Sequence, residues 1–329
     1  MDENFSELLN IARTGRLLIV GNECSGHGDG NEFQRVTAAV LDAAGRAHEF
    51  LMVAPERLKQ TAAAAVLRAR ESGGVVIAAG GDGTINTVAQ AVLGSGVPFG
   101  VLPQGTFNYF GREHGIPEGS EAAAGVFANL TLKPVQVGRV AGRIFLVNAS
   151  LGLYPQLLED REAHKKRFGR RRAVALISAV TSLLNRHRQL DLEFESEGAT
   201  SHLRTLTLFA GNNRLQLERI GIEQAHSGVL ERGELVCTVL RPISRLKMLG
   251  LILRGALGHL GNAKNVDSFA FRKLTVTPRR QRRMKLGTDG EVAWAATPLM
   301  FEVAAEKLLL ITPAPSAAKQ ATDASATTP

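Results

Sequence analysis

The chain has 329 residues, a length typical of two domains. Hydrophobic residues make up 44% of it and charged residues 21%, which excludes a collagen, a disordered chain and a disulfide-stapled miniprotein. Lysine and arginine number 39 against 31 aspartates and glutamates, so the formal charge is +8. This excess indicates an anionic partner, and nucleic acid, anionic lipid and phosphorylated small molecules all qualify.

The cysteines and the hydropathy of the chain indicate in which cellular compartment the protein is expected. Cys24 and Cys237 are more than two hundred residues apart, so a disulfide is not demanded and a reducing compartment is expected. The acidic start, MDENFSELLN, is not typical of a signal peptide. No apolar run approaches the roughly 18–20 residues that span a bilayer. We therefore expect a soluble or peripheral protein.

The first 135 residues alternate short apolar runs with helical patterns. Strands are expected at 16–20, 48–54, 75–79 and 98–103, and a helical pattern follows each of them. Continuous apolar strands separated by helices favour a parallel sheet that is covered on both faces.

The pattern changes near residue 135 to an alternation of apolar and polar residues. Segments 189–196 and 202–210 predict a hairpin, and similar segments continue to residue 313. Clear helical patterns remain only at 173–185 and 243–260. We expect an antiparallel β domain, followed by a disordered tail at 314–329 that is rich in Ala, Ser, Thr and Pro.

The sharpest local signal is AAGGDGTIN at 78–86, where a buried strand runs into three glycines and then into helical spacing. Glycines let backbone amides approach an anion, and a helix N-terminus adds favourable partial charge. Thr84 is expected as the helix N-cap, and Asp82 is a candidate ligand of a metal or of the sugar region. A plain strand–turn–helix connection is the alternative. The acid among three glycines favours a phosphate site.

Two further loops follow strands in the same way, GNECSGHGDG at 21–30 and PQGTFN at 103–108. Each is weak alone, because Gly-Ser-Asn loops are common. In a parallel sheet, however, all three lie at the carboxyl ends of strands, where ligands bind. The three loops together therefore predict one shared nucleotide cleft.

A fourth feature is Thr288-Asp289-Gly290-Glu291. On an uninterrupted strand, the period of two places Asp289 and Glu291 on the same side, where two carboxylates could divide metal binding and proton abstraction. The alternative, which the Asp-Gly pair by itself favours, is a plain hairpin turn.

Taken together, these motifs resemble the diacylglycerol kinase catalytic-domain family, which includes bacterial kinases of diacylglycerol, phosphatidylglycerol or sphingoid-like alcohols. The resemblance rests on the order of Asn22…Ser25-Gly26, GGDGTIN at 80–86, GTFN at 105–108 and DGE at 289–291, and it covers about residues 15–312. GGDGT alone also occurs in NAD kinases and 6-phosphofructokinases, so the set matters more than any member.

The resemblance implies a three-layer α/β nucleotide-binding domain with a parallel sheet over 1–135. It also implies an antiparallel β-sandwich lipid-substrate domain over 136–303, with the active cleft between the two domains. The C-terminal segment at about 304–313 is then expected to pack back against the first domain.

The resemblance also implies a reaction, the transfer of the ATP γ-phosphate to a lipid hydroxyl with Mg²⁺. Glu291 matches the family's proton acceptor, with Asp289 beside it and Asp82 as a further catalytic residue. Asp82 and Asp289 are the expected metal ligands. The residues implied to bind ATP are Asn22, Ser25, Gly26, Gly80, Gly81, Asp82, Gly83, Thr84, Asn86, Gly105, Thr106 and Asn108.

Two positions depart from the family's pattern. The family's usual acid after the GTxN asparagine is Tyr109 here, which removes a residue implicated in the water-mediated Mg²⁺ network. In VLERGEL at 229–235, Arg232 stands where some members use an Asp-Gly to hold a structural metal, so no metal is expected at that loop.

Two basic clusters hold much of the excess charge, seven Lys or Arg in 161–172 and five in 279–285. Such clusters can simply form a solvated charged surface, or they can bind an anionic membrane. If the substrate is a lipid, membrane contact is favoured, because each cation near an anionic membrane surface contributes about 1 kcal/mol to binding. Nucleic acid is disfavoured, because aromatic residues make up only 5% and no reading motif occurs. We expect a cytoplasmic enzyme, peripheral at the inner face of the membrane.

Two rivals remain beside the lipid kinase. An NAD kinase shares GGDGT but should carry a downstream Asn-Glu pair, and this chain has Asn212-Asn213 instead. A non-catalytic nucleotide- or lipid-binding protein on a degenerate kinase scaffold is suggested by Tyr109 and Arg232.

Overall fold

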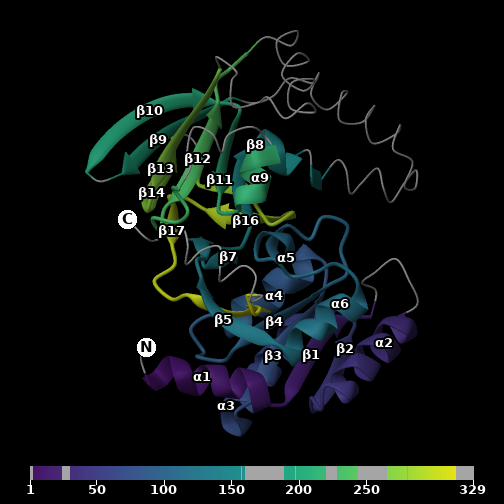
Figure 1. Ribbon diagram of the computed structural model, residues 1–329. Helices are drawn as coiled ribbons and strands as arrows, with labels where there is room; N and C mark the ends of the chain where they lie inside the picture. The colour runs from purple at the N-terminus through teal and green to yellow at the C-terminus, as the bar shows by residue number, and fades with distance from the viewer. Residues whose placement is uncertain are drawn as a thin grey trace. The chain divides into compact units, whose positions relative to one another are not determined.

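The computed structural model describes residues 3–23, 30–156, 158–159, 189–196, 198–219, 228–243, 265–279 and 281–315. The helix expected at 173–185 and the basic cluster at 161–172 lie outside the described residues. So do all but the first residue of the helix expected at 243–260 and all but the first two of the expected tail. The chain divides into two compact units, 1–135 with 307–329, and 136–306 (Figure 1).

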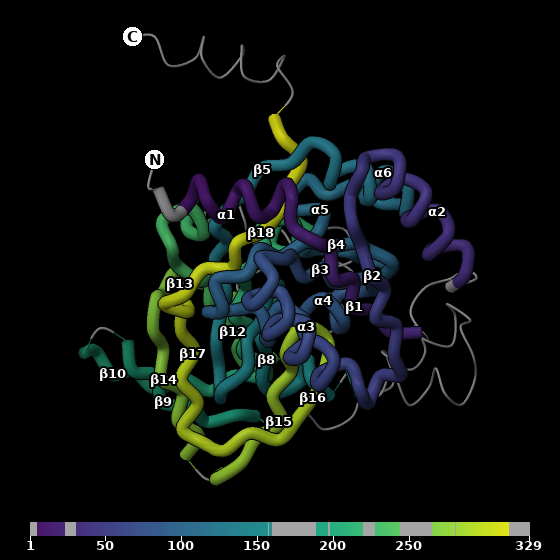
Figure 2. The backbone as a smooth tube through the Cα atoms, turned by 90° about the horizontal axis from the view of Figure 1, so that it is seen from below, coloured from purple at the N-terminus to yellow at the C-terminus, as the bar shows by residue number. Residues whose placement is uncertain are grey.

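Unit 1 is built on a six-stranded sheet in the order β2-β1-β3-β4-β18-β5. Its first five strands in this order are parallel and β5 is antiparallel to β18, so the expected parallel sheet is confirmed. Figure 2 shows β18, in yellow, running beside β5 although the two are far apart in sequence. The strands are β1 (Leu17–Asn22), β2 (His48–Val53), β3 (Val75–Gly80), β4 (Phe99–Pro103), β5 (Leu130–Val135) and β18 (Leu308–Pro313).

Helices connect these strands. The connections from β2 to β3 and from β3 to β4 run in one direction along the sheet, and the connection from β1 to β2 runs in the other. Because such connections are usually right-handed, this order predicts α3 and α4 on one face and α2 on the opposite face. In agreement, α3 packs against α4, and α2 against α6. The helices are α1 (Glu3–Thr14), α2 (Gly30–Ala43), α3 (Leu58–Ser72), α4 (Asp82–Val92), α5 (Tyr109–Glu113) and α6 (Ser120–Gly125), with short 3₁₀ turns at Pro55–Arg57 and Val126–Ala128.

Unit 2 consists of two six-stranded sheets that share one apolar core, and every strand pair in them is antiparallel, as the alternating pattern predicts. The first sheet contains β10 (Ala199–Thr205), β9 (Leu190–Ser196), β14 (Lys273–Pro278), β17 (Leu299–Val303), β6 (Gly138–Val140) and β7 (Arg143–Phe145) in spatial order. The second contains β13 (Val266–Phe271), β12 (Leu235–Leu240), β11 (Thr207–Gly211), β8 (Asn148–Gly152), β15 (Arg283–Thr288) and β16 (Glu291–Ala296). A short helix, α9 (Arg214–Arg219), follows β11.

A buried cation ties three segments of unit 1 together. The guanidinium of Arg46, whose residue is 7% exposed, donates from Nη1 to the carbonyl of Phe127 at 2.6 Å. Its Nη2 donates to the carbonyls of Ala12 at 2.8 Å and Gly15 at 3.3 Å, at the C-terminal end of α1. Helix C-termini carry unpaired carbonyls and negative partial charge, so a cation suits this place.

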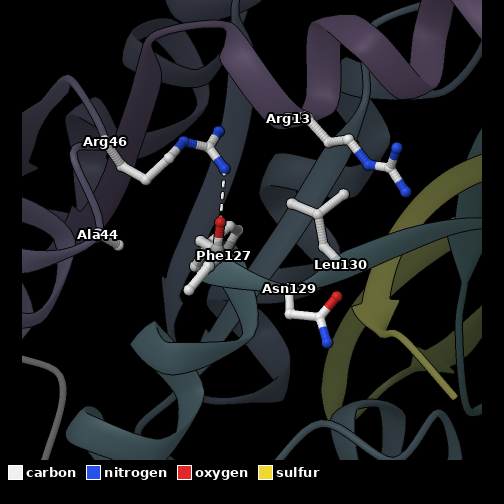
Figure 3. Close-up of a pocket in the computed structure, with 7 residues that line it drawn as sticks. Arg13, Ala44, Arg46, Phe127, Asn129 and Leu130 are labelled. Carbon is white, nitrogen blue, oxygen red and sulfur yellow. Dashed lines mark hydrogen bonds between the residues drawn. The ribbon is translucent and has the colours of Figure 1, made fainter. Parts of the chain in front are cut away.

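Arg46 also lines a cavity of about 240 Å³, shown in Figure 3. Its guanidinium is directed at the Phe127 carbonyl, and Arg13 of α1 lies across the cavity. Burial lowers the pKa of Arg46, but the three carbonyl partners account for the position of its charge without an anion. We therefore interpret Arg46 as a structural clamp.

Replacing Arg46 by Met should leave three carbonyls without their charged donor, each in a partly closed site. We expect the free energy of unfolding to fall by about 2–4 kcal/mol, measured by chemical denaturation. Arg13→Met, on the exposed rim of the same cavity, should change it by no more than about 0.5 kcal/mol. Equal unfolding of both variants would contradict the clamp.

Candidate active site

The three glycine-containing loops leave three neighbouring strands at one edge of the unit 1 sheet. Asn22 ends β1, Gly80 ends β3 and Pro103 ends β4. The parallel register pairs Gly21 with Ala79, and Gly80 with Pro103, so these ends are level. Ser25 and Gly26, in the first loop, lie outside the described residues. The other two loops are brought into contact.

The second loop is shorter than the sequence indicates. Helix α4 begins at Asp82 with Gly81 as its N-cap, so the expectation that Thr84 is the N-cap is wrong. Gly81 has an extended backbone (φ −81°, ψ 179°), which lets the chain leave the strand and enter the helix directly. Thr84 is instead buried in the first turn, and a Cβ on Gly80 would lie 2.6 Å from the Cβ of Thr84. Only glycine fits at position 80 without a rearrangement.

The start of α4 presents backbone amides at this edge of the sheet. The amide of Ile85 is the first in the helix to bond back, to the Gly81 carbonyl at 3.0 Å. The amides of Asp82, Gly83 and Thr84 precede it, and such amides form an anion site together with the helix dipole. Asn86 lies half-buried in the same helix.

The third loop is closed by a side chain that imitates backbone. Asn108 accepts from the Gly105 amide through Oδ1 and donates from Nδ2 to the Gly105 carbonyl, both at 2.9 Å. Its residue is buried and left-handed (φ 47°), a conformation in which Asn is favoured among non-glycine residues. Thr106 is exposed within this loop.

The second and third loops interlock. The Gln104 amide donates to the Gly80 carbonyl at 2.9 Å, and a Cβ on Gly105 would lie 2.9 Å from the Cα of Gly81. Neither loop can therefore move far without the other.

Asp82 bridges the same two loops through its side chain. Backbone amides of Asn108, Tyr109 and Phe110, at the start of α5, donate to the carboxylate and work to lower its pKa. Burial outweighs them, and the pKa of Asp82 is raised above its ordinary value. The Oδ1 atom is buried without a hydrogen-bond partner in the described part of the chain. An ionised carboxylate with one spare oxygen suits a hard cation such as Mg²⁺.

Beside Asp82, two aromatic rings stack at the start of α5. The rings of Phe107 and Tyr109 are 5.7 Å apart between centroids and lie within 6° of parallel. Phe107 is 37% exposed. Tyr109 thus makes an aromatic contact at the position where the resembling family usually has an acid.

The Asp-Gly-Glu segment of unit 2 is a hairpin, so the turn that the Asp-Gly pair favours is confirmed, and Asp289 and Glu291 do not share one uninterrupted strand. Asp289 (φ 46°) and Gly290 (φ 90°) form a two-residue turn between β15 and β16, and Thr288 pairs with Glu291. Positive φ at both central residues is the signature of the tight turn that Asp-Gly favours. Glu291 is exposed as the first residue of β16.

The carboxylate of Asp289 anchors this turn to the start of β8. It accepts from the amides of Leu146 at 2.7 Å, Val147 at 2.9 Å and Asn148 at 2.9 Å, while its own amide donates to the Asn148 carbonyl at 2.9 Å. Most of its accepting capacity is therefore used by backbone. This arrangement fixes the hairpin tip and, with it, the backbone of Glu291.

Sequence reasoning missed a buried carboxamide network behind this anchor. Asn148 donates from Nδ2 to Gln216 Oε1 at 3.0 Å, and the backbone amide of Gln216 donates to Asn213 Oδ1 at 2.9 Å. Asn212 donates to the Leu146 carbonyl at 3.1 Å and accepts from Gln136 at 2.8 Å. The dipeptide Asn212-Asn213 was the available signal, since adjacent carboxamides at the end of a β pattern must find partners when buried.

Charge at other predicted positions is also partnered. Arg232 donates to Glu234 at 3.3 Å, and its carbonyl accepts from Arg272 at 2.8 Å. Within the described ranges, no three His, Cys, Asp or Glu side chains gather to form a metal site. Among the same residues, no helix is long and apolar enough to cross a bilayer.

The stretch of chain that forms these loops is similar to a known protein family. Residues 16–140 match the diacylglycerol kinase catalytic domain. The expected resemblance to that family is thereby confirmed for the stretch that carries all three glycine loops. The matched stretch is less than half of the chain.

Two curated relatives carry the same name. The chain is 42% identical over 89 residues to a diacylglycerol kinase of Bacillus subtilis (strain 168), covering 26% of this chain and 29% of that protein. It is 30% identical over 159 residues to a diacylglycerol kinase of Mycobacterium tuberculosis (strain ATCC 25618 / H37Rv), covering 46% and 50%. The chain thus spans half or less of the length of these relatives.

Structural similarity extends further than sequence similarity. A crystal structure of a diacylglycerol kinase from Bacillus anthracis str. Sterne superimposes with a TM-score of 0.64, covering 91% of this chain and 96% of that one. The sequences are 18% identical, so this likeness establishes a shared fold and nothing beyond it.

Asp289→Asn tests the hairpin anchor. Asparagine tolerates the left-handed turn, but its amide offers one acceptor oxygen where a carboxylate met three amides. Hydrogen bonds to charged groups contribute about 1.5–3 kcal/mol each, so we expect the free energy of unfolding to fall by roughly 2–4 kcal/mol.

The measurement is chemical denaturation, with Glu291→Gln as the matched carboxylate-to-amide control two residues away. Glu291 is exposed, and its replacement should change stability by no more than about 0.5 kcal/mol. Similar losses in both variants would show that Asp289 is not an anchor.

Proposed function

We propose that the protein is an ATP-dependent lipid kinase that transfers the γ-phosphoryl group to a hydroxyl of a diacylglycerol-like or related lipid alcohol. The observation that carries this proposal is the pair of interlocked glycine loops at a level strand edge, within the stretch that matches the diacylglycerol kinase catalytic domain. The names of the two curated relatives support the choice of a lipid acceptor.

ATP is proposed to bind at the carboxyl edge of the unit 1 sheet. The amides of Asp82, Gly83 and Thr84 that begin α4 would donate to phosphate oxygens, and Gly81 keeps the N-cap free of a side chain. Asn22, Ser25, Gly26, Asn86, Thr106 and Asn108 complete the proposed nucleotide site. Asn108 contributes through the loop that it closes.

Asp82 is the residue proposed to hold Mg²⁺, because its buried Oδ1 has no protein partner in the described ranges. Mg²⁺ is commonly bound by one or two carboxylates together with substrate phosphates, so a single protein carboxylate is enough. Bound there, the ion would neutralise charge on the transferring phosphate. Asp289 was predicted as a second ligand, but its contacts with three amides favour a positioning role.

Glu291 is the proposed general base. It is an exposed carboxylate on a turn that the Asp289 anchor holds in place. It would orient the lipid hydroxyl and take its proton while the hydroxyl oxygen bonds to the γ-phosphorus and ADP leaves. Unit 2 is accordingly proposed as the lipid-substrate unit. Peripheral contact with the inner face of the membrane follows from the location of such substrates.

Gly81→Ala tests the phosphate site with little cost to the fold. Gly81 has an extended backbone conformation that any residue can adopt, and within 4 Å a Cβ there would meet only Gly105, at 3.4 Å. The methyl group would, however, stand at the N-cap where phosphate oxygens are proposed. We expect ATP affinity, measured by calorimetry, to fall about tenfold or more, the size of one lost hydrogen bond to a charged group.

Gly125→Ala is the matched control, because a Cβ there meets nothing within 4 Å and its backbone is helical. It should bind ATP as the wild type does. If Gly81→Ala also binds ATP with unchanged affinity, the proposed phosphate site is wrong.

Glu291→Gln tests the general base. Positioned proton acceptors contribute about 10²–10⁴-fold, so transfer of labelled phosphate from ATP to a panel of lipid alcohols should fall by that factor while ATP affinity is retained. A fully active variant rules out Glu291 as the base.

The wild-type assay also separates the rivals. ATP binding without transfer to any lipid favours the non-catalytic scaffold to which Tyr109 points. Phosphorylation of NAD in place of lipid favours the NAD kinase.

A further inference from the structure

The chain has one tryptophan, Trp294, and it is among the most exposed large apolar side chains in the described residues. It lies on β16, the edge strand of its sheet, and is 59% exposed. Tryptophan is normally well buried, so an exposed one on a sheet edge calls for an explanation.

Strand register places Trp294 on the outer face of the sheet. Trp294 lies opposite Lys285, while Met284 pairs with Ala295 and both of these belong to the core. Side chains alternate along a strand, so Lys285 and Trp294 share the face turned away from that core. The Lys285 ammonium lies 5.7 Å from the centroid of the indole ring, within the range of a cation–π contact.

The surroundings of Trp294 are positively charged. Arg283, on the same face of β15, is its diagonal neighbour, and Arg282 precedes it; both are exposed and have no ion pair among the described residues. Lys285 is neutralised by Glu159 at 2.5 Å, and Arg279 lies 3.9 Å from Asp191. Arg283 therefore gives this face a positive charge with no counter-ion among the described residues, and Arg282, on the bend just before β15, adds a second exposed cation next to it.

We propose that Trp294, with Arg282 and Arg283, forms an interfacial anchor that docks the β15–β16 hairpin onto an anionic lipid bilayer. This deepens the proposed lipid kinase function and rests on it for the reason to meet a bilayer. Indole is apolar with one polar N–H, which suits the headgroup region of a membrane, and each arginine is attracted to anionic headgroups. The contact is a surface one.

The anchor lies close to the proposed base. Glu291 is three residues before Trp294 on the same strand, about 10 Å away at the rise of a β-strand. An odd spacing puts the two side chains on opposite faces of the strand. Docking through Trp294 would therefore hold the hairpin tip at the level of the lipid headgroups while leaving Glu291 uncovered by the anchor.

The single tryptophan makes the test direct. Emission from the full-length wild type is recorded as vesicles of phosphatidylglycerol and phosphatidylcholine are added, without ATP. We expect a blue shift with the anionic vesicles, quenching by brominated acyl chains, and no change with vesicles of phosphatidylcholine alone.

Vesicle sedimentation then measures partitioning of the variants. Trp294→Ala should weaken partitioning about tenfold through lost apolar contact, and Arg282→Gln/Arg283→Gln about thirtyfold through two lost headgroup attractions. Two matched controls in unit 1 should leave partitioning unchanged. One is Leu67→Ala, where the side chain is 60% exposed, and the other is the exposed pair Arg57→Gln/Lys59→Gln.

Three outcomes would overturn the anchor. One is tryptophan emission that stays unchanged when anionic vesicles are added, whether or not the protein binds to them. Another is equal partitioning of Trp294→Ala and Leu67→Ala. The last is a blue shift that depends on protein concentration without lipid, which would assign β16 to pairing with a second copy. Because none of these measurements uses ATP, they fail or succeed independently of phosphoryl transfer.

Discussion

Gly81 and Gly105 approach each other so closely that neither loop has an independent conformation. The strand register sets this contact, since β3 and β4 end level and send their chains across the same edge. Once the two backbones touch, the side chain of Asp82 reaches the amides that begin α5, and Asn108 closes the loop from the other side. The start of α4 and the buried oxygen of Asp82 are consequences of that one close approach.

In unit 2, the β15–β16 hairpin is held by a small number of contacts, and its two acidic residues differ in their surroundings. Asp289 uses its charge on three backbone amides, whereas Glu291, two residues on, keeps its carboxylate in solvent. Two neighbouring acids thus have separate roles, one holding the backbone and one available for chemistry. Buried carboxamides such as Asn148 and Gln216 extend the support without adding charge.

The parallel sheet of unit 1 and the glycine loops after β3 and β4 could be predicted from the sequence, because buried parallel strands are continuous apolar runs and glycines follow the strand ends. The role of Asp289 was not predictable, since its partners at 146–148 are some 140 residues away and contribute only backbone. Thr84 was misplaced because an extended glycine can start a helix with no capping side chain. Arg46 carries no pattern at all, for its three partners are carbonyls that any residues could supply.

The position of β18 determines when the sheet of unit 1 can be completed during synthesis. It lies between β4 and β5, and β5 has no other strand partner in the described sheet. During synthesis, β5 therefore has no strand to pair with until the whole of unit 2 has been made and residues 308–313 have left the ribosome. Nascent chains that already carry the complete glycine loops will therefore still lack the β18–β5 side of the sheet.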